Sequence, residues 1–509
     1  MTKTIKFTLL SALFSMLSIQ GFSQAFDGYA LYNAAGQSTA YLIDSEGDIA
    51  HSWSCPTSAN YAMALAPSGN IVRGAQYSGG QIEGAAIGGM VQELDPNGDV
   101  VWEFIYSSST YISHHDICLM PNGHVLLIAW EYVANSDLEE MGYEGNDNKY
   151  ASHIIEVAQD GTGGEIAWEW HVVDHLIQDG DSELLNFGVV SEHPELLNIN
   201  IPTSSGGGSG GSDASDWFHC NGIDYNETLD QIVFSSRFLS EIFIIDHSTT
   251  IEEAASHTGG NSGMGGDFIY RWGNPDNYDT AGDQVLTNAC HDARWIIDDG
   301  RPNGGFIQIF NNSGNNGASA IDAIDAPANG SNYDLTAGQA YEPTSYSWRH
   351  NCIASASGQS SSDRMSNGNV FVNLAGGMGG AGYMYEVDED DNIVFQYSAG
   401  TNKAFRYECD HPGIQALLEN PCETADNVEE NSQLVFTIFP NPSTGVFQMI
   451  GEFSQAGPDQ ILIHDTFGRL VASFRNVQEM DLSAKANGVY YVTVSFEGKQ
   501  NTRMISIAK

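Results

Sequence analysis

Basic side chains are scarce in this sequence. Its 509 residues include 18 lysines and arginines against 65 aspartates and glutamates, which gives a formal net charge of −47. Nucleic acids and anionic membranes are bound through basic patches, so the composition excludes both as partners. Acidic surfaces of this kind are typical of proteins that stay soluble in salt, and calcium binding by acidic loops such as residues 388–391 is the second interpretation.

Long apolar runs are also missing after the N-terminus. Lys3 and Lys6 precede an apolar run at residues 7–19, and small or polar residues follow at 21–24. This order predicts a signal peptide over residues 1–24, too short to be a transmembrane helix, and hence an exported protein without a transmembrane segment. The chain has no P-loop and no dinucleotide fingerprint, so neither a nucleotide nor another cofactor is predicted.

The chain has only seven cysteines, an odd number without even spacing, so a dense disulfide framework is excluded. Cys409 and Cys422 flank a short segment and are the best candidates for a disulfide, which export would permit. The cysteines near histidines are interpreted as small packing residues. They are Cys118, Cys220, Cys290 and Cys352.

The acidic excess is not uniform along the chain. Residues 433–509 hold six basic and six acidic side chains, whereas residues 25–432 hold 10 basic and 59 acidic ones. This change of composition predicts a boundary near residue 430, with a large domain over 25–430 and a small one over 431–509.

Two kinds of β-hairpin alternate along the large domain. In the first, an apolar strand, an acidic turn and a second strand ending in an aromatic residue follow one another. In the second, a histidine stands near the start of the first strand in most copies. The second kind spans Tyr61 to Ala75, His115 to Trp130, His219 to Arg237, His291 to Asn312 and His350 to Leu374.

Successive hairpins with almost no helical periodicity predict an all-β fold, a β-propeller of five or six blades. Since the first strand of each blade lines a central channel, the histidines at these strand starts are expected to converge. Residues 174–216 are interpreted as a long insertion over one mouth of the channel, of the kind that gates or shapes a site.

The tail predicts a small β-sandwich of short alternating strands. Its order of Pro440-Asn441-Pro442, a central Asp465 with Gly468-Arg469, Gly488-Val489-Tyr490-Tyr491 and a basic end resembles the type A sorting domains of the type IX secretion system. The resemblance implies the type IX secretion machinery as a partner, a secreted or cell-surface location, and removal of the tail in some cases.

Four motifs of the large domain occur in a characteristic order. They are Ser113-His114-His115-Asp116 before Pro121-Asn122-Gly123, Trp217-Phe218-His219-Cys220-Asn221 before Ser235-Ser236-Arg237, Cys290-His291-Asp292-Ala293 before Phe310-Asn311-Asn312, and Asn332-Tyr333-Asp334-Leu335 before Gly338-Gln339-Ala340-Tyr341. In order and content they resemble the arylsulfate sulfotransferase family, over about residues 30–400. Members of that family are β-propellers that move a sulfuryl group from an aryl sulfate to a phenol without a nucleotide donor.

The resemblance implies catalytic roles for four residues. His291 would be the nucleophile that forms a sulfohistidine, surrounded by His115, His219 and Arg237. These residue types suit the chemistry, because a neutral imidazole is a nucleophile at neutral pH and a guanidinium offers a planar set of donors to sulfate oxygens. The other histidines can protonate the departing phenolate and deprotonate the incoming phenol. No metal ligands are predicted.

Some assignments stay open. His114 competes with His115, which is preferred because it precedes Asp116 as His291 precedes Asp292, and His350 before Asn351 is a weaker candidate. Arg294 is expected to point away from the site by strand alternation. Four aromatic residues, Trp217, Phe218, Trp295 and Trp348, are candidates for stacking on an aryl ring, although packing between blades explains them equally well.

Two other functions remain possible at this level. Converging histidines are also ligands for a divalent metal in propeller hydrolases or lactonases, although a cation such as Arg237 would repel the metal. A non-catalytic propeller at the cell surface that binds glycan or protein is the third hypothesis.

Overall fold

The computed structural model describes residues 25–34, 37–202, 214–280, 287–376, 382–399, 401–422, 436–451, 453, 457–465, 469–496 and 499–509. The chain divides into two compact units, Met1–Pro421 and Cys422–Lys509. The predicted boundary at residue 430 and the predicted signal peptide at 1–24 both lie outside the described residues.

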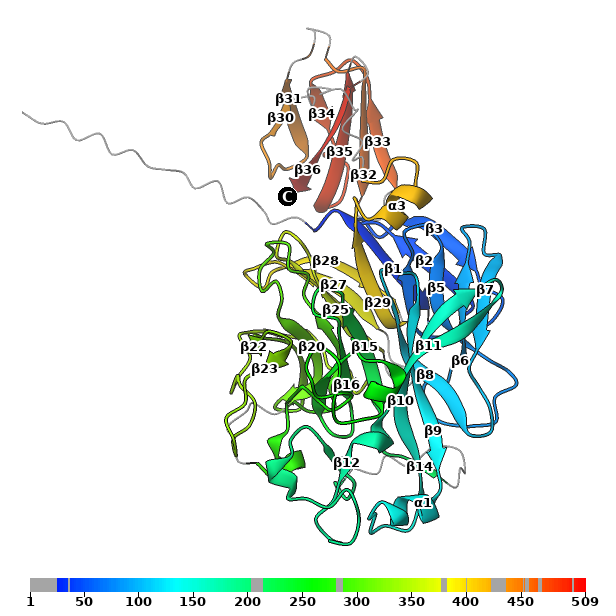
Figure 1. Ribbon diagram of the computed structural model, residues 1–509. Helices are drawn as coiled ribbons and strands as arrows, with labels where there is room; N and C mark the ends of the chain where they lie inside the picture. The colour runs from blue at the N-terminus through cyan, green and yellow to red at the C-terminus, as the bar shows by residue number, and fades with distance from the viewer. Residues whose placement is uncertain are drawn as a thin grey trace, which may run out of the picture. The chain divides into compact units, whose positions relative to one another are not determined.

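The first unit is a six-bladed β-propeller (Figure 1). Each blade is an antiparallel sheet whose innermost strand lies against the innermost strands of the two neighbouring blades, and the last of these contacts the first. Numbered from the blade that contains β1, the inner strands of the six blades are β29 (Thr401–Glu408), β4 (Ala59–Leu65), β8 (Tyr111–Leu119), β15 (Cys220–Asn226), β19 (His291–Trp295) and β25 (Ser361–Arg364). The predicted all-β propeller is confirmed, and the structure fixes the number of blades.

The remaining blade strands follow the inner ones outward in chain order. They are β1 (Gly28–Ala34), β2 (Thr39–Ile43) and β3 (Ile49–Ser54), outside β29; β5 (Ile71–Gln76), β6 (Gly89–Leu94) and β7 (Val100–Ile105); β9 (Val125–Val133), β10 (Asn148–Asp160) and β11 (Gly163–His171); β16 (Gln231–Ser236), β17 (Glu241–Asp246) and β18 (Tyr270–Trp272); β20 (Ile307–Asn315), β21 (Ala318–Ile324) and β24 (Trp348–Asn351); and β26 (Val370–Leu374), β27 (Tyr383–Val387) and β28 (Ile393–Ser398).

Helical segments are short. They are α1 (Asn135–Glu140), α2 (Ile251–Ala254), α3 (Pro412–Leu417) and the 3₁₀ turns η1 (Val172–His175), η2 (Val190–Glu192) and η3 (Pro275–Tyr278). Small ladders join β12 (Leu176–Ile177) to β13 (Leu197–Asn198) and β22 (Ala328–Asn329) to β23 (Asn332–Tyr333). Strand β14 (Ala214–Asp216) runs parallel to β10 and adds a fifth strand to its sheet.

The ring closes through the two ends of the unit. Strand β29, the last in sequence, pairs antiparallel with β1, the first, so that Tyr29 lies opposite Tyr407. Closure leaves no exposed sheet edge between the first and last blades, which is how propellers avoid edge-to-edge association.

The turns between the two outermost strands of three blades repeat one pattern of hydrogen bonds. Oδ1 of Asp44, Asp95 and Asp388 each accepts hydrogen bonds from the backbone N–H groups two and four residues later, at 2.8–3.0 Å. Each turn leads to an outer strand with a buried aromatic residue, respectively Trp53, Trp102 and Phe395. The acidic residue Asp388 of the 388–391 loop therefore has a structural role as a turn cap.

The prediction that residues 350–374 form an inner hairpin is wrong. His350 lies on β24, the outermost strand of the fifth blade, where it pairs with Ile321 of β21. Its ring nitrogens contact Asp391 Oδ1 at 2.8 Å and Tyr385 Oη at 2.9 Å. The inner strand of the sixth blade is β25, which carries no histidine. The 23 residues between β21 and β24 separate these paired strands in the sequence, so no local pattern shows that His350 belongs to the preceding blade.

The second unit is a β-sandwich, as predicted. One sheet has the order β30 (Phe436–Phe439), β31 (Val446–Gly451) and β34 (Glu479–Asp481). The other has the order β33 (Leu470–Phe474), β32 (Gln460–Asp465), β35 (Gly488–Phe496) and β36 (Lys499–Ile507). Alternate residues of both sheets form one apolar core, including Phe447, Ile463 and Val492.

Cys409 and Cys422 are both disulfide-bonded, in agreement with the expected pair, and the other five cysteines are free. Among the residues that the structure describes, no helix is long and apolar enough to cross a membrane.

Candidate active site in the propeller channel

Four residues predicted from the sequence line a single cavity of about 290 Å³. They are His115, His219, Arg237 and His291, contributed by three successive blades. The other lining residues are Tyr61, Glu83, Gly84, Ala85, Trp130, Tyr150, Asp216, Phe238, Gly358 and Gln359. The size approaches the lower end of the range for small-molecule sites, about 300–1,000 Å³.

Irregular inner strands aim the histidines into this cavity. The register of the inner strand shifts between Ser113 and Ile117 in β8, between Cys220 and Gly222 in β15, and between His291 and Arg294 in β19. Positive φ angles accompany these bulges, at 53° for His115 and 52° for His219. A bulge turns a side chain out of the regular alternation, and left-handed φ angles in non-glycine residues mark backbone that the surroundings hold in place.

The hydrogen bonds of His291 fix its tautomer. Its Nδ1 lies 2.9 Å from the carbonyl oxygen of Ala289 and 2.7 Å from Oδ1 of Asn312. The Asn312 amide nitrogen donates to the carbonyl oxygens of Ala356 and Gln359, so its oxygen must face the histidine. Both neighbours of Nδ1 are therefore acceptors, Nδ1 carries the proton, and Nε2 keeps its lone pair.

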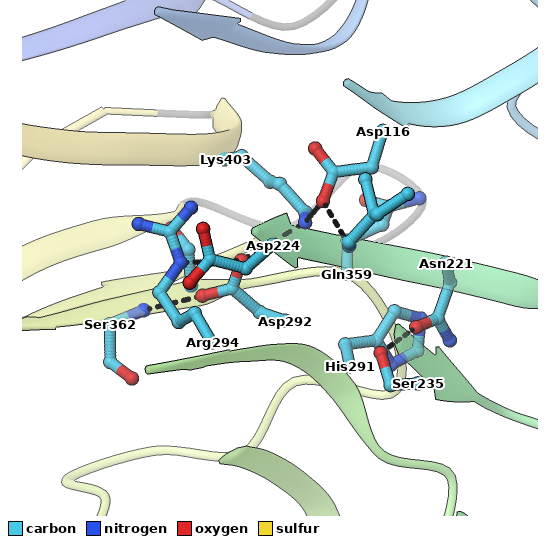
Figure 2. A network of polar contacts seen from close by, with 12 residues as sticks. Asp116, Asn221, Asp224, Ser235, His291, Asp292, Arg294, Gln359, Ser362 and Lys403 are labelled. Carbon is cyan, nitrogen blue, oxygen red and sulfur yellow. Dashed lines mark hydrogen bonds and ion pairs between the residues drawn. The ribbon is translucent and has the colours of Figure 1, made fainter. Parts of the chain in front are cut away.

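The backbone before His291 is anchored as well. The side-chain amide of Asn221 donates to the carbonyl oxygen of Cys290 at 2.9 Å. The side-chain oxygen of Asn221 accepts from the Ser235 hydroxyl at 2.6 Å, a contact that Figure 2 shows beside His291. Burial raises the pKa of the Cys290 thiol to about 12, so this cysteine stays protonated and acts as a packing residue, as the sequence analysis expects.

The surroundings of His291 and His115 keep these two imidazoles neutral. Burial lowers the pKa of His291 well below its ordinary value of 6.5, and the nearby Arg237 and His219 lower it further. Burial, followed by the neighbouring His219 and His114, has the same effect on the pKa of His115. Since only the neutral ring has a nucleophilic nitrogen, His291 is in its reactive form at neutral pH.

His219 forms a short hydrogen bond with a carboxylate. Its Nδ1 contacts Oδ2 of Asp216, and its backbone N–H donates to Oδ1 of the same residue at 3.1 Å. Phe238 stacks on the imidazole with ring centroids 4.6 Å apart. Asp216 ends the insertion predicted at 174–216, of which residues 203–213 lie outside the described part of the chain. The insertion thus contributes a polar group to the cavity.

His115 and His114 have different surroundings. His115 lines the cavity, and its ring lies 4.5 Å from that of His219. His114 lies behind it, with its ring 4.2 Å from Trp130 and its Nδ1 2.7 Å from Nδ1 of His115. The preference for His115 over His114 as the residue that faces the site agrees with this arrangement.

Arg237 brings a positive charge to the cavity, and no carboxylate among the described residues forms an ion pair with it. Its Nη1 donates to the carbonyl oxygen of Ser357 at 2.7 Å. Gly358 stands between this guanidinium and His291, because a Cβ atom there would lie 2.6 Å from Nη1 of Arg237 and 3.8 Å from Cε1 of His291. The missing side chain keeps open a space that both groups border.

The aromatic wall differs from the candidates named from the sequence. Tyr61, Trp130, Tyr150 and Phe238 line the cavity, and Trp130 stacks on Tyr150 with centroids 5.6 Å apart. The earlier candidates pack instead in hydrophobic cores between blades. They are Trp217, Phe218, Trp295 and Trp348. Tyr61 holds the strand-start position that histidines hold in other blades. This position in the sequence is the signal that could have identified Tyr61 as a residue of the cavity lining.

Aspartates of four inner strands join neighbouring blades, and two of them, Asp116 and Asp292, directly follow a cavity histidine. Asp116, Asp224, Asp292 and Asp363 each accept a hydrogen bond, at 2.7–3.1 Å, from a backbone N–H of the next inner strand. The donors are Ile223, Trp295, Ser362 and Arg406, in that order. In the two His-Asp motifs, the histidine faces the cavity, and the aspartate binds the backbone of the adjacent blade.

Lys403 neutralises two of these buried carboxylates. Its Nζ lies 2.6 Å from Asp116 Oδ2 and 3.0 Å from Asp292 Oδ1 (Figure 2). Arg294 belongs to the same polar core, with Nη1 3.0 Å from Asp363 Oδ1 and its guanidinium over the ring of Phe405. Arg294 is thus not part of the cavity lining, as strand alternation predicted, but it lies among the inner strands and not on the outside of a blade.

The cavity histidines do not form a metal-ligating set. Among the described residues, three groups of side chains have ligand atoms close enough to hold one ion, and none includes His115, His219 or His291. The arrangement combines a neutral nucleophile, a carboxylate-linked imidazole and an unpaired guanidinium beside an aromatic wall. Such a set suits the transfer of an anionic group from an aromatic molecule.

Comparisons with known proteins agree with this chemistry. A family model described as arylsulfotransferase (ASST) matches residues 20–334, and one described as a secretion system C-terminal sorting domain matches residues 437–508. A comparison with curated proteins finds no significant match.

Solved structures with a similar course of the chain include three bacterial proteins. A protein of unknown function from Bacteroides caccae has 11% identity and a TM-score of 0.40, with 75% of this chain and 98% of that chain covered. The periplasmic gluconolactonase PpgL of Pseudomonas aeruginosa has 11% identity and a TM-score of 0.36, with 94% and 99% covered. Apo AztD from Citrobacter koseri has 10% identity and a TM-score of 0.32, with 75% and 98% covered. At these scores the likeness carries no argument about function.

Proposed function

The chain belongs to the arylsulfotransferase (ASST) family, and from this membership we propose that it moves a sulfuryl group from an aryl sulfate ester to a phenolic acceptor through a sulfohistidine at His291. No nucleotide takes part in this reaction. The tautomer of His291 is the observation that carries the proposal, because it leaves Nε2 as a nucleophile in a cavity that also holds Arg237.

In the first half-reaction, Nε2 of His291 attacks the sulfur of the ester. The N–S bond forms as the bond between sulfur and the aryl oxygen breaks, and the electron pair leaves with the phenolate. The ring then carries a positive charge with its proton still on Nδ1. The carbonyl oxygen of Ala289 and Oδ1 of Asn312 accept from that proton and stabilise the charged ring.

Arg237 and His115 are proposed to hold the sulfuryl oxygens. The guanidinium retains two nitrogens beyond its bond to Ser357, and it stays charged in proteins at all relevant pH values. His115 is neutral, so it contributes a hydrogen bond without repelling Arg237. Fixed donors aimed at the equatorial oxygens stabilise the transition state because charge redistributes over those oxygens.

His219 is proposed as the general acid and base. It gives a proton to the departing phenolate and, in the second half-reaction, takes one from the incoming phenol, which then attacks sulfur and releases His291. Asp216 acts through it as a positioning residue, because its hydrogen bond with Nδ1 orients the ring. The aromatic wall suits the rings of donor and acceptor, which leave and enter in turn.

The test is turnover of an aryl sulfate by the purified protein, with and without a phenol, followed by phenol release and intact mass. We expect turnover that depends on the acceptor and a protein mass increased by one sulfuryl group when the acceptor is withheld. Replacement His291→Ala should remove the mass increase and lower kcat/KM by about 10³-fold or more. Full activity of His291→Ala would overturn the proposal.

The metal-dependent hydrolase or lactonase remains the alternative hypothesis. Its signature is turnover of lactones or esters that rises with added divalent cations and does not require a phenol. The absence of a ligating set among the described cavity histidines and the presence of Arg237 favour the sulfotransferase.

The C-terminal unit is a sorting domain, so the protein is exported. We assign its delivery to the type IX secretion machinery, preceded by passage across the first membrane with residues 1–24 as the signal peptide. Deletion of residues 431–509 should leave the propeller behind in the periplasm, which immunoblotting of cell fractions would detect. Equal delivery of the truncated and full chains to the cell exterior would exclude this role for the tail.

A further inference from the structure

A second cluster of ligating side chains lies on the third blade, away from the cavity lining. Glu131 of β9, His153 of β10 and His171 of β11 share one face of the sheet. His153 lies opposite His171, and Ala151, two residues before His153 on the same strand, lies opposite Glu131. Their ligand atoms all lie within 4.8 Å of one another. Two imidazoles and one carboxylate form a typical donor set for divalent transition metals.

One ligand atom of this cluster is buried without a partner. His153 is 1% exposed, and its Nδ1 makes no hydrogen bond to any described residue. A buried polar nitrogen without a partner is costly, so its retention requires an explanation. Its other nitrogen, Nε2, lies 2.8 Å from Oη of Tyr106. When Nε2–H donates to that oxygen, the lone pair of Nδ1 is left for a ligand, which is how hydrogen bonds behind metal-binding histidines orient them.

The other two side chains already contact each other, and a rotation of the His171 ring would let both imidazoles direct a nitrogen to one ion. Nδ1 of His171 lies 3.0 Å from Oε1 of Glu131, and the rings of His153 and His171 are parallel with centroids 5.0 Å apart. Two ligand atoms of a tetrahedral zinc ion are about 3.3 Å apart when each lies about 2.0–2.1 Å from the metal. His171 and Glu131 are partly exposed, at 25% and 23%, so an ion can reach the site from solvent.

We propose that Glu131, His153 and His171 bind a divalent transition cation, with Zn²⁺ as the best fit. The ion takes the place of the proton shared between His171 and Glu131, satisfies Nδ1 of His153, and keeps one position for water. Glu169 lies beside it, with Oε2 3.7 Å from Nε2 of His171, and adds negative charge that attracts the cation.

The proposed metal site connects two blades of the propeller. It joins three strands of the third blade to Tyr106, which follows β7 of the second blade. Glu131 is the neighbour in sequence of Trp130, which lines the cavity from the opposite face of β9. The bound ion therefore stiffens the strands that carry one wall of the candidate active site.

The other two groups with ligating geometry are poorer sites. In the group of His175, His257 and Asp267, both nitrogens of His175 already have partners, Asp267 at 2.7 Å and the carbonyl oxygen of Ala254 at 2.9 Å. In the group of Asp27, Cys409 and Cys422, the two thiols are consumed in disulfide bonding. Neither contains a buried nitrogen without a partner.

The experiment is a calorimetric titration of the chelator-treated full chain with Zn²⁺, with thermal unfolding measured at each ratio. We expect one equivalent to bind, with release of protons and a Tm that rises with the logarithm of the free Zn²⁺ concentration. The variants His171→Gln and Glu131→Gln should each weaken binding by about 100-fold or more. Titration with Co²⁺ gives an independent signal, because a shared imidazole set changes the visible spectrum of the ion.

The matched control is His257→Gln, an exposed histidine of the second group, which should bind Zn²⁺ like the unaltered chain. Retention of tight binding in both His171→Gln and Glu131→Gln, or its loss in His257→Gln, would overturn the assignment. Absence of any stoichiometric binding would do the same. Because the readout is binding and not turnover, the outcome is independent of the proposed sulfotransfer.

Discussion

Oδ1 of Asn312 lies 2.7 Å from Nδ1 of His291, across the first two strands of the fifth blade. The contact decides which nitrogen of the proposed nucleophile carries the proton, since Asn312 is itself oriented by the carbonyl oxygens of Ala356 and Gln359. The tautomer of His291 is thus set by neighbouring segments and not by the histidine alone.

The variant Asn312→Ala should keep the nucleophile but lose part of its orientation. We expect kcat to fall by about 10- to 100-fold with little change in KM for the donor, because the lost contact matters most when the ring becomes positively charged. Steady-state kinetics with an aryl sulfate and a fixed phenol would measure this. An unchanged kcat would show that the carbonyl oxygen of Ala289 suffices to hold the tautomer.

Asp216→Asn should impair the proposed acid and base without affecting donor binding. The short hydrogen bond from His219 would lose its charged acceptor, and kcat should fall by about 10²- to 10⁴-fold, with partial recovery in Asp216→Glu. The matched control is Asp230→Asn, which removes a carboxylate from His247, a histidine outside the cavity lining. Equal losses in both variants would indicate a general structural effect.

Gly358→Ala should close the space between Arg237 and His291. The added Cβ would approach Nη1 of Arg237 to 2.6 Å, and the flexible guanidinium would have to move. We expect kcat/KM to fall by about tenfold or more with little change in Tm. Gly123→Ala should show the opposite pattern, because Gly123 has a φ of +86° and open space around it. There the cost is about 1 kcal/mol of stability and the activity is retained.

Lys403→Met should destabilise the propeller strongly. It would leave Asp116 and Asp292 buried without their shared cation, and breaking a buried ion pair in this way costs about 3–5 kcal/mol. Lys149→Met is the comparison, because Lys149 is also buried but its partner Asp147 is 43% exposed and stays hydrated when the lysine is removed, so the loss should be smaller. Chemical denaturation of both variants would compare them, and similar losses would contradict the central role of Lys403.

The stability of the protein should fall as the pH drops below 6.5. The folded chain lowers the pKa values of His114, His115 and His291 well below this value, chiefly by burial, so the unfolded chain binds more protons there. Each such histidine contributes about 1.4 kcal/mol per pH unit to the loss. Stability gains nothing from these groups above pH 6.5, where both states are neutral.

His114→Phe tests this sign, because a phenylalanine keeps the ring contact with Trp130 and removes the titrating group. The free energy of unfolding should then depend less steeply on pH between about 6.5 and 5. An unaltered slope would mean that His114 is protonated in the folded chain. Because the pKa values of His115 and His291 also lie well below 6.5, kcat/KM should start to fall with acid only well below that pH.

The sequence by itself determined the class of the fold and pointed to four residues that line the cavity. Alternating hairpins with acidic turns and aromatic strand ends are local patterns, since a turn cap such as Asp95 binds only the backbone N–H groups two and four residues later. The motifs around His115, His219 and His291 also lie on consecutive residues, so they could be found without coordinates.

Only the tertiary structure decided how these pieces meet. The number of blades depends on the pairing of β1 with β29, strands at opposite ends of the unit, and no local pattern encodes that pairing. The position of His350 on an outer strand, the aromatic wall and the contact of Asp216 with His219 likewise depend on bulges and on segments distant in sequence. Local hydrogen bonds and hydrophobic period specify strands, whereas long-range packing selects which strand becomes the inner one, and that choice places the chemistry.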